Sequence, residues 1–178
     1  MTFVENDSDV KIAGDKPSRD IRKNIAASEE KNVSGEQRAA AKRVGAAVAE
    51  QFLKNAGELP EDNTDYGLLI QRRLLLSFSA TAGFEQYITD DTLSGVAQKS
   101  FLDALKKAGD EIYKTSSDMG AFSFYYLAFR RGNDIERRIG QTFAMLCSHD
   151  GDPIYQELGE ALYCWFNSVV RKAVKENL

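Results

Sequence analysis

From Ser34 onward, apolar residues recur along the chain at the three- and four-residue spacing of an α-helix. Glycine, proline and Asp-containing segments interrupt this spacing and divide the chain into six predicted helices. The helices cover residues 34–56, 65–88, 91–114, 118–131 and 134–149, and a last one opens at Asp152 and Pro153. No stretch of any length shows the alternation of a half-buried strand. The pattern predicts an all-α protein, a compact bundle of about six helices with short loops.

Three of the predicted helices differ in how their apolar residues are distributed. The helix at 65–88 is apolar on nearly all sides, which is typical of a helix in the middle of a bundle. The helix at 34–56 has many Ala and Gly residues, which allow a neighbouring helix to approach closely. The last helix has a single predicted inner face: Tyr155, Leu158, Leu162, Trp165, Phe166, Val169 and Ala173.

Residues 1–33 are polar and of mixed charge, with seven acids and six Lys or Arg. Such a segment buries too little apolar surface to offset the entropy lost on ordering, so we expect a flexible N-terminal tail. The segment has no apolar core of a secretory signal. The predicted organisation is a flexible tail at 1–33 and a single α-helical domain at 34–178.

The charge and cysteine content exclude several classes of function. The net charge of −4 lacks the basic excess of a dedicated nucleic-acid binder, so we expect no nucleic-acid partner. No apolar run reaches the 18 or so residues that cross a bilayer, so we expect no membrane association. Two cysteines, Cys147 and Cys164, are too few for a disulfide framework, and they are typical of reduced thiols in a cytoplasmic protein.

The chain has one histidine, His149, which limits the chemistry available to it. A di-iron bundle site needs two Glu-x-x-His pairs, and neither a phosphate-binding loop nor a nucleophile elbow is present. A zinc site is conceivable from Cys147, His149, nearby aspartates and Cys164, but both cysteines lie in or beside apolar helix faces. We therefore predict no metal and no cofactor. Chemistry based on carboxylates or lysines alone stays open as a third hypothesis, but the sequence singles out no catalytic residue.

Arg72 and Arg73 lie inside the most apolar helix and, being adjacent, do not point the same way. At least one is expected near the bundle interior, where an unpaired charge is costly. The favoured interpretation is an internal ion pair with a carboxylate of another helix. The functional alternative is an internal pocket for an anionic ligand.

Residues 125–141, YYLAFRRGNDIERRIGQ, hold two arginine pairs around a Gly-Asn-Asp corner. A helix-turn-helix is rejected because Asn133, Arg138 and Gln141 occupy its apolar packing positions. Arg130 and Arg131 suit a helix end, whereas Arg137 and Arg138 fall in a first turn, where stability alone favours acids. The corner is interpreted as solvated, with Asp134 paired to Arg138, or as a site for an anion or an acidic partner.

The helix at 118–131 carries more aromatic residues than one buried face needs. Tyr125 and Tyr126 lie with phenylalanines on one face, and Phe124 and Leu127 lie beside it. The second surface is consistent with a subunit interface, where Tyr and Arg are enriched, or with a helix buried on two sides.

The leading hypothesis is a non-catalytic protein-interaction or regulatory module in the cytoplasm, with another protein or a second copy as partner. The alternative is a small-ligand-binding bundle with an inter-helix pocket for an anionic or aromatic ligand. The candidate ligand- or partner-binding residues are Arg72, Arg73, Tyr125, Tyr126, Arg130, Arg131, Arg137 and Arg138. An enclosed cavity would favour the ligand binder, and an exposed apolar patch the interaction module.

Overall fold

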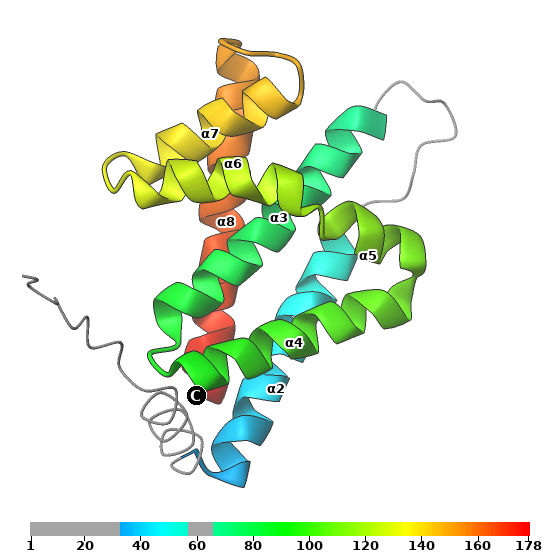
Figure 1. The fold of residues 1–178 in the computed structure, drawn as a ribbon, viewed down its shortest axis with the longest axis vertical. Helices are drawn as coiled ribbons and strands as arrows, with labels where there is room; N and C mark the ends of the chain where they lie inside the picture. The colour runs from blue at the N-terminus through cyan, green and yellow to red at the C-terminus, as the bar shows by residue number, and fades with distance from the viewer. Residues whose placement is uncertain (1–32, 57–65) are drawn as a thin grey trace, which may run out of the picture. The chain divides into compact units, whose positions relative to one another are not determined.

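The computed structural model describes residues 33–56 and 66–178, which belong to one compact unit, Val33–Leu178. The described residues form α-helices and no strand, which confirms the all-α prediction (Figure 1). Apart from Val33, the predicted tail at 1–33 lies outside them. The helices are α2 (Gly35–Asn55), α3 (Tyr66–Tyr87), α4 (Asp91–Ala108), α5 (Asp110–Ser116), α6 (Met119–Arg130), α7 (Ile135–Leu146) and α8 (Pro153–Asn177).

The helix starts follow from local capping chemistry. Ser34 accepts a hydrogen bond from the Gln37 amide, and the Gln37 side chain accepts one from the Ser34 amide, which completes a capping box at α2. Asp118 accepts hydrogen bonds from the first amides of α6. At α8, Asp152 is the N-cap and Pro153 occupies the first turn, as predicted.

Two of the predicted helix boundaries are wrong. The range 91–114 is not one helix, because Gly109, with φ of 159° and ψ of 143°, leaves the helical region and separates α4 from α5. The helix expected to reach 149 ends at Leu146, and Ser148 then takes a left-handed conformation with φ of 62°. Gly132, with φ of 78°, ends α6 as the sequence predicted.

Helix α3 lies at the centre of the described unit, as its all-round apolar pattern predicted. It contacts all six of the other described helices, and its residues 73–84 are buried without interruption. Side chains on two faces of α3 belong to two separate clusters of buried residues. Leu76, Ala80 and Phe84 belong to the first cluster, and Leu74 and Phe78 belong to the second.

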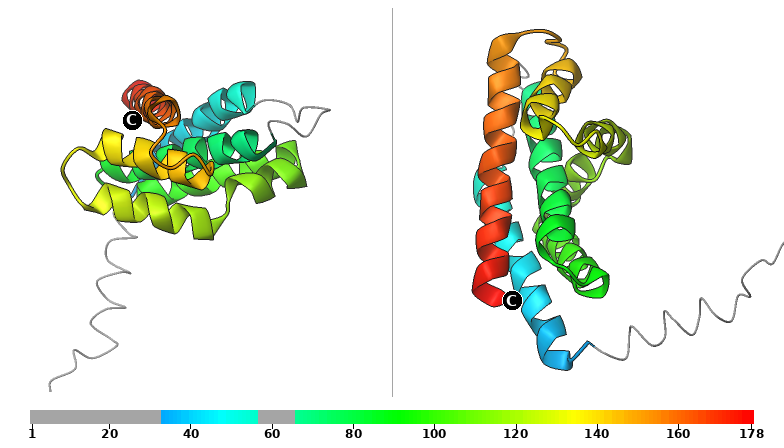
Figure 2. Two further views of the ribbon diagram at one scale, coloured as in Figure 1. Left: turned by 90° about the horizontal axis from the view of Figure 1, so that it is seen from above. Right: turned by 90° about the vertical axis from the view of Figure 1, so that its left-hand side faces the viewer.

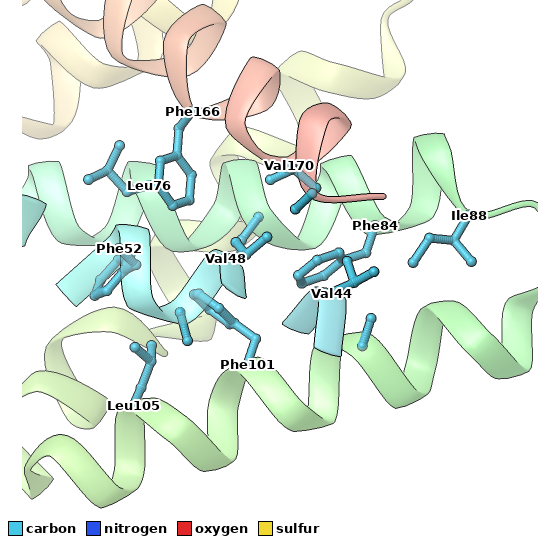
Figure 3. Close-up of a cluster of buried hydrophobic side chains, with 14 of the residues drawn as sticks. Val44, Val48, Phe52, Leu76, Phe84, Ile88, Phe101, Leu105, Phe166 and Val170 are labelled. Atoms are coloured by element: carbon cyan, nitrogen blue, oxygen red, sulfur yellow. The ribbon is translucent and has the colours of Figure 1, made fainter. Parts of the chain in front are cut away.

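The first cluster joins α2, α3, α4 and the C-terminal half of α8 (Figure 3). At its centre the Phe52 ring meets Phe101 edge-on at a centroid distance of 5.7 Å and Phe166 at 6.3 Å. The second cluster joins α3, α6, α7 and Tyr163 of α8. Each cluster includes residues of α8, so this helix contributes to both. The side view in Figure 2 shows α8 running alongside the other helices for most of the length of the described unit.

Two glycines allow close contact between helices. A methyl group at Gly45 of α2 would collide with the Ala97 carbonyl oxygen of α4 and lie 2.8 Å from Ser100 Cβ. A methyl group at Gly140 of α7 would collide with the Gln156 carbonyl oxygen of α8. The small residues of α2 therefore do what the sequence predicted, which is to let a second backbone approach.

The inner face of α8 differs from the predicted one. Leu158 and Trp165, expected inside, are 38% and 39% exposed. The residues that α8 buries are Gly159, Tyr163, Phe166, Val170 and Ala173. The predicted and the observed buried residues both have helical spacing, so the sequence pattern alone does not tell which of them face the core. Packing of α8 against α2, α3 and α7 decides this.

Gly45→Ala and Gly140→Ala are each expected to lower the free energy of unfolding by about 2 kcal/mol, because the added methyl group forces two backbones apart. Gly95→Ala in α4 is the matched control. No atom lies within 4 Å of a methyl group at Gly95, so this change should stabilise by about 0.5–1 kcal/mol through helix propensity. Urea denaturation followed by circular dichroism measures all three. Equal effects at Gly45 and Gly95 would contradict the close approach of α2 and α4.

Candidate functional site

Helix α6 presents one aromatic face to the core and leaves another outside. Phe78 of α3 stacks on the Tyr125 ring at 5.2 Å and meets Tyr126 edge-on at 5.2 Å. Phe124 and Leu127, on the other side of α6, are 48% and 56% exposed. The core therefore uses Tyr125 and Tyr126, and the second surface predicted for this helix remains uncovered in the described unit.

The uncovered face of α6 forms one wall of a groove. The other wall is α7, which packs beside α6 (Figure 1). The groove has a volume of about 270 Å³, and Met145, 41% exposed, faces it from α7. We call this surface the α6/α7 groove; its lining residues are Phe124, Leu127, Ala128, Arg131, Arg138, Gln141, Thr142, Met145 and Asp150.

Two of the four arginines around the Gly-Asn-Asp corner line this groove. Arg131 is the C-cap residue of α6, and Arg138 lies in the first turns of α7. Arg130 and Arg137 are exposed and do not line it. The Asp134 carbonyl accepts a backbone hydrogen bond from Arg138, but the predicted ion pair between these two side chains does not form. The Arg138 guanidinium is therefore available to the groove.

Arg73 lies elsewhere, in the middle of the unit, and is 1% exposed. Its Nη1 donates to Glu111 Oε1 at 2.9 Å, and its Nε donates to the Ala56 carbonyl at 3.1 Å. Thr115 Oγ1 lies 3.4 Å from the same Nη1. Arg73 thus has a carboxylate partner from another helix, as the favoured interpretation expects, but the Glu111 side chain is 47% exposed, so the pair reaches the surface on that side. The Arg73 charge also holds the last turn of α2 through a carbonyl.

Arg72 occupies a different environment from its neighbour. It is half-buried, and its Nε is buried without a hydrogen-bond partner in the described part of the chain. Gln71 Oε1 is likewise buried and unpartnered. Arg72 and Arg73 both lie outside the α6/α7 groove, so the structure does not bring them together with the arginines of the corner.

Tyr126 links α6 to the end of α3. Its hydroxyl donates to Glu85 Oε1 at 3.2 Å. Burial of the phenol, together with the nearby Glu85 carboxylate, raises the pKa of Tyr126 to about 12. Tyr125 is fully buried and its hydroxyl has no partner among the described residues, and burial raises its pKa further. Both hydroxyls therefore stay protonated at neutral pH.

The residues considered for a metal site do not converge. Within the two described ranges, no group of three or more His, Cys, Asp or Glu side chains could hold a metal ion. The His149 ring instead stacks on Tyr155, with centroids 3.8 Å apart. Burial raises the pKa of Cys147 to about 11, so this thiol is a poor nucleophile at neutral pH.

In the described segments, no helix combines the length and apolarity that crossing a membrane requires. Comparison of the chain with protein-family models, with curated proteins and with solved structures gives no match.

The sequence pointed to Arg131, Arg138, Phe124 and Leu127 as candidate binding or interface residues, but it did not identify Gln141, Thr142 and Met145 as the rest of the α7 wall. Met145 directly follows the buried residues Phe143 and Ala144, and nothing in the sequence pattern indicates that it faces α6. In the sequence, Gln141 argues only against a helix-turn-helix, and its place in the groove is not predicted. Which residues of α7 face α6 depends on how the two helices pack.

Arg73→Ala is expected to lower the free energy of unfolding by about 3 kcal/mol or more, because it leaves a cavity and removes hydrogen bonds to α2 and α5. Glu111→Gln keeps a neutral acceptor near a guanidinium that still contacts Ala56, and should cost about 1 kcal/mol. Arg72→Ala is the matched control and should cost less than about 1 kcal/mol. Chemical denaturation checks the order. A larger loss at Arg72 than at Arg73 would show that the wrong arginine has been assigned the internal role.

Proposed function

We propose that this protein is a cytoplasmic, non-catalytic interaction module that binds an acidic amphipathic helix of another protein in the α6/α7 groove. The observation that carries the proposal is the set of exposed apolar side chains, Phe124, Leu127 and Met145, in one groove with Arg131 and Arg138. Exposed apolar residues that gather in a groove mark binding surfaces more often than singly scattered ones do.

The shape of the groove supports a helical ligand. Its walls are two neighbouring twelve-residue helices, α6 and α7, and its apolar residues come from both. A helix laid into such a groove presents anchors at positions i, i+3 or i+4, and i+7. Phe124 and Leu127 lie three residues apart on one wall, which matches the spacing of successive anchors along a docked helix.

The charge of the groove supports an acidic partner. Arg131 and Arg138 contribute two positive charges to its lining and Asp150 contributes one negative charge. Arg130 and Arg137 lie next to them in the sequence and are exposed. With Asp134 and Glu136, which are also exposed at this corner, the count is four arginines against three acids. This small positive excess, on a chain whose net charge is −4, favours a partner with carboxylates beside its apolar anchors.

The alternative of a small-ligand bundle receives less support. Of the central arginines proposed to bind an anion, Arg73 already donates to Glu111 and Ala56. The α6/α7 groove opens to solvent along its length and does not enclose a ligand. Both features favour a macromolecular partner over a small molecule that must be surrounded on most sides.

The proposal is tested by photo-crosslinking in cells of the source organism. A benzoylphenylalanine residue at position 127 should capture a partner, and mass spectrometry of the crosslinked peptide should identify a helical segment with Asp or Glu beside its apolar positions. The control carries the same group at Lys114, an exposed position of α5 outside the groove. Identical products at 127 and 114, or a basic segment at 127, would overturn the proposal.

Charge reversal gives the quantitative prediction. Arg131→Glu and Arg138→Glu should each weaken binding of the captured segment, as a synthetic peptide, by about tenfold or more, because an attractive pair becomes repulsive. Arg137→Glu makes the same change in the same helix outside the groove and should change the Kd by less than about threefold. Fluorescence anisotropy at low salt measures the three constants. Equal losses at 137 and 138 would mean that only the overall charge matters.

A further inference from the structure

Helix α8 carries a second exposed apolar surface, separate from the α6/α7 groove. Ile154 is 73% exposed, and Leu158, Ala161 and Trp165 follow it on the outer side of the helix. These residues are spaced by four, three and four positions, and Ser168 and Lys172 continue the same spacing. This is the alternation that joins two helices in a coiled coil. We call these six residues the α8 stripe.

The α8 stripe lies on the exposed side of α8, and its last residue, Lys172, borders a groove that is also lined by Ala47 and Glu50 of α2. The buried residues of α8, among them Tyr163, Phe166 and Val170, lie on the opposite side of the helix and contact α2, α3 and α7. In Figure 2, α8 lies along the edge of the described unit in the side view. Within the described part of the chain, Ile154 therefore keeps most of its surface exposed, and Trp165, whose ring contacts Phe166, keeps 39% of its surface exposed.

We propose that a second copy of this chain binds the α8 stripe, so that two α8 helices pair antiparallel about a two-fold axis. In a symmetric antiparallel pair, facing residues have numbers that add to a constant. The spacing of the stripe sets this sum at 326, which places Ala161 opposite Trp165 and Leu158 opposite Ser168 of the second copy. Ile154 then lies opposite Lys172, whose aliphatic stem packs on it while the ammonium group reaches solvent.

The charges beside the stripe fit this register. Glu157 and Arg171 are both exposed on the same flank, and neither forms an ion pair within the described residues. In the antiparallel pair the flanking positions have numbers that add to 328, so Glu157 of each copy faces Arg171 of the other. The dimer gains two symmetric ion pairs, which is how flanking charges specify helix orientation.

The parallel arrangement is disfavoured by the same residues. It would place each stripe residue opposite its own copy, and Lys172 would then meet Lys172 in the contact layer. Among the described residues, Lys172 pairs with Glu176 at 3.8 Å on the exposed surface of the same helix. Two facing ammonium groups repel each other there, whereas the antiparallel register separates them to opposite ends.

Cys164 gives the proposed register a distinct signature. Because twice 164 is 328, the two Cys164 residues face each other across the two-fold axis. The thiol is exposed, and its partial burial and the carboxylates of Glu136 and Glu160 raise its pKa. It therefore remains a protonated free thiol at neutral pH, and its exposure leaves it accessible to a thiol-reactive crosslinker.

The experiment measures the mass of the full-length protein by sedimentation equilibrium. The wild type should be a dimer, Glu157→Arg and Arg171→Glu should each raise the dimer Kd by about tenfold or more, and the double reversal should restore it. Circular dichroism checks that each variant folds. A monomer at every concentration up to about 100 μM would overturn the proposal. So would a dimer that ignores the single reversals, or a double variant that stays as weak as the singles.

Two further readouts locate the contact. Trp165 is the single tryptophan of the chain, so its emission should shift to shorter wavelength as concentration rises through the Kd. A short bismaleimide should link two copies of Cys147→Ala through Cys164, and no link should form when Cys164→Ser is added. An unshifted emission, or no crosslink in a protein that is dimeric, would assign the dimer to another face. These results do not depend on the α6/α7 groove, so each of the two proposals can fail while the other holds.

Discussion

The fold depends on the need to cover α3 on every side. Its residues 73–84 are buried without interruption, and large apolar side chains point from it in all directions. Burying each such side chain contributes about 1.5–3 kcal/mol, so leaving one face open would be costly. The chain meets this need by surrounding α3 with the other six described helices and by forming a separate cluster of buried residues on each of its two sides.

The one charge on this buried segment shows how strict the requirement is. Arg73 is carried into the interior with its helix and must be neutralised there. The break at Gly109 starts a new helix, α5, and Glu111 and Thr115 of this short helix both lie at the Arg73 guanidinium. A feature that interrupts a helix in the sequence thus places the polar partners of the central helix.

Two of the helices that cover α3, α6 and α8, pack into the core with one face and leave another face exposed. Helix α6 gives Phe122 and Tyr125 to the core and leaves Phe124 and Leu127 outside. Helix α8 does the same with Phe166 inside and Trp165 outside. The two proposals assign these outer faces to different partners, an acidic helix and a second copy, because arginines surround one surface and charges of both signs lie beside the other. The α6/α7 groove suits a partner of opposite charge, whereas the surface of α8, with charges of both signs beside it, is complementary to a second copy of itself.

The sequence by itself determined the helical class, most of the helices, the capping residues Ser34 and Asp152 and the central position of α3, but not the break at Gly109. Each depends on residues three or four apart, such as Ser34 with Gln37, or on an apolar pattern within one segment. Only the tertiary structure decided that Glu111 is the partner of Arg73, that Arg131 and Arg138 share a groove with Met145, and that Leu158 and Trp165 face outward. The reason is physical: helical spacing gives the relative directions of side chains on one helix, whereas what each direction meets depends on distances between helices far apart in the chain.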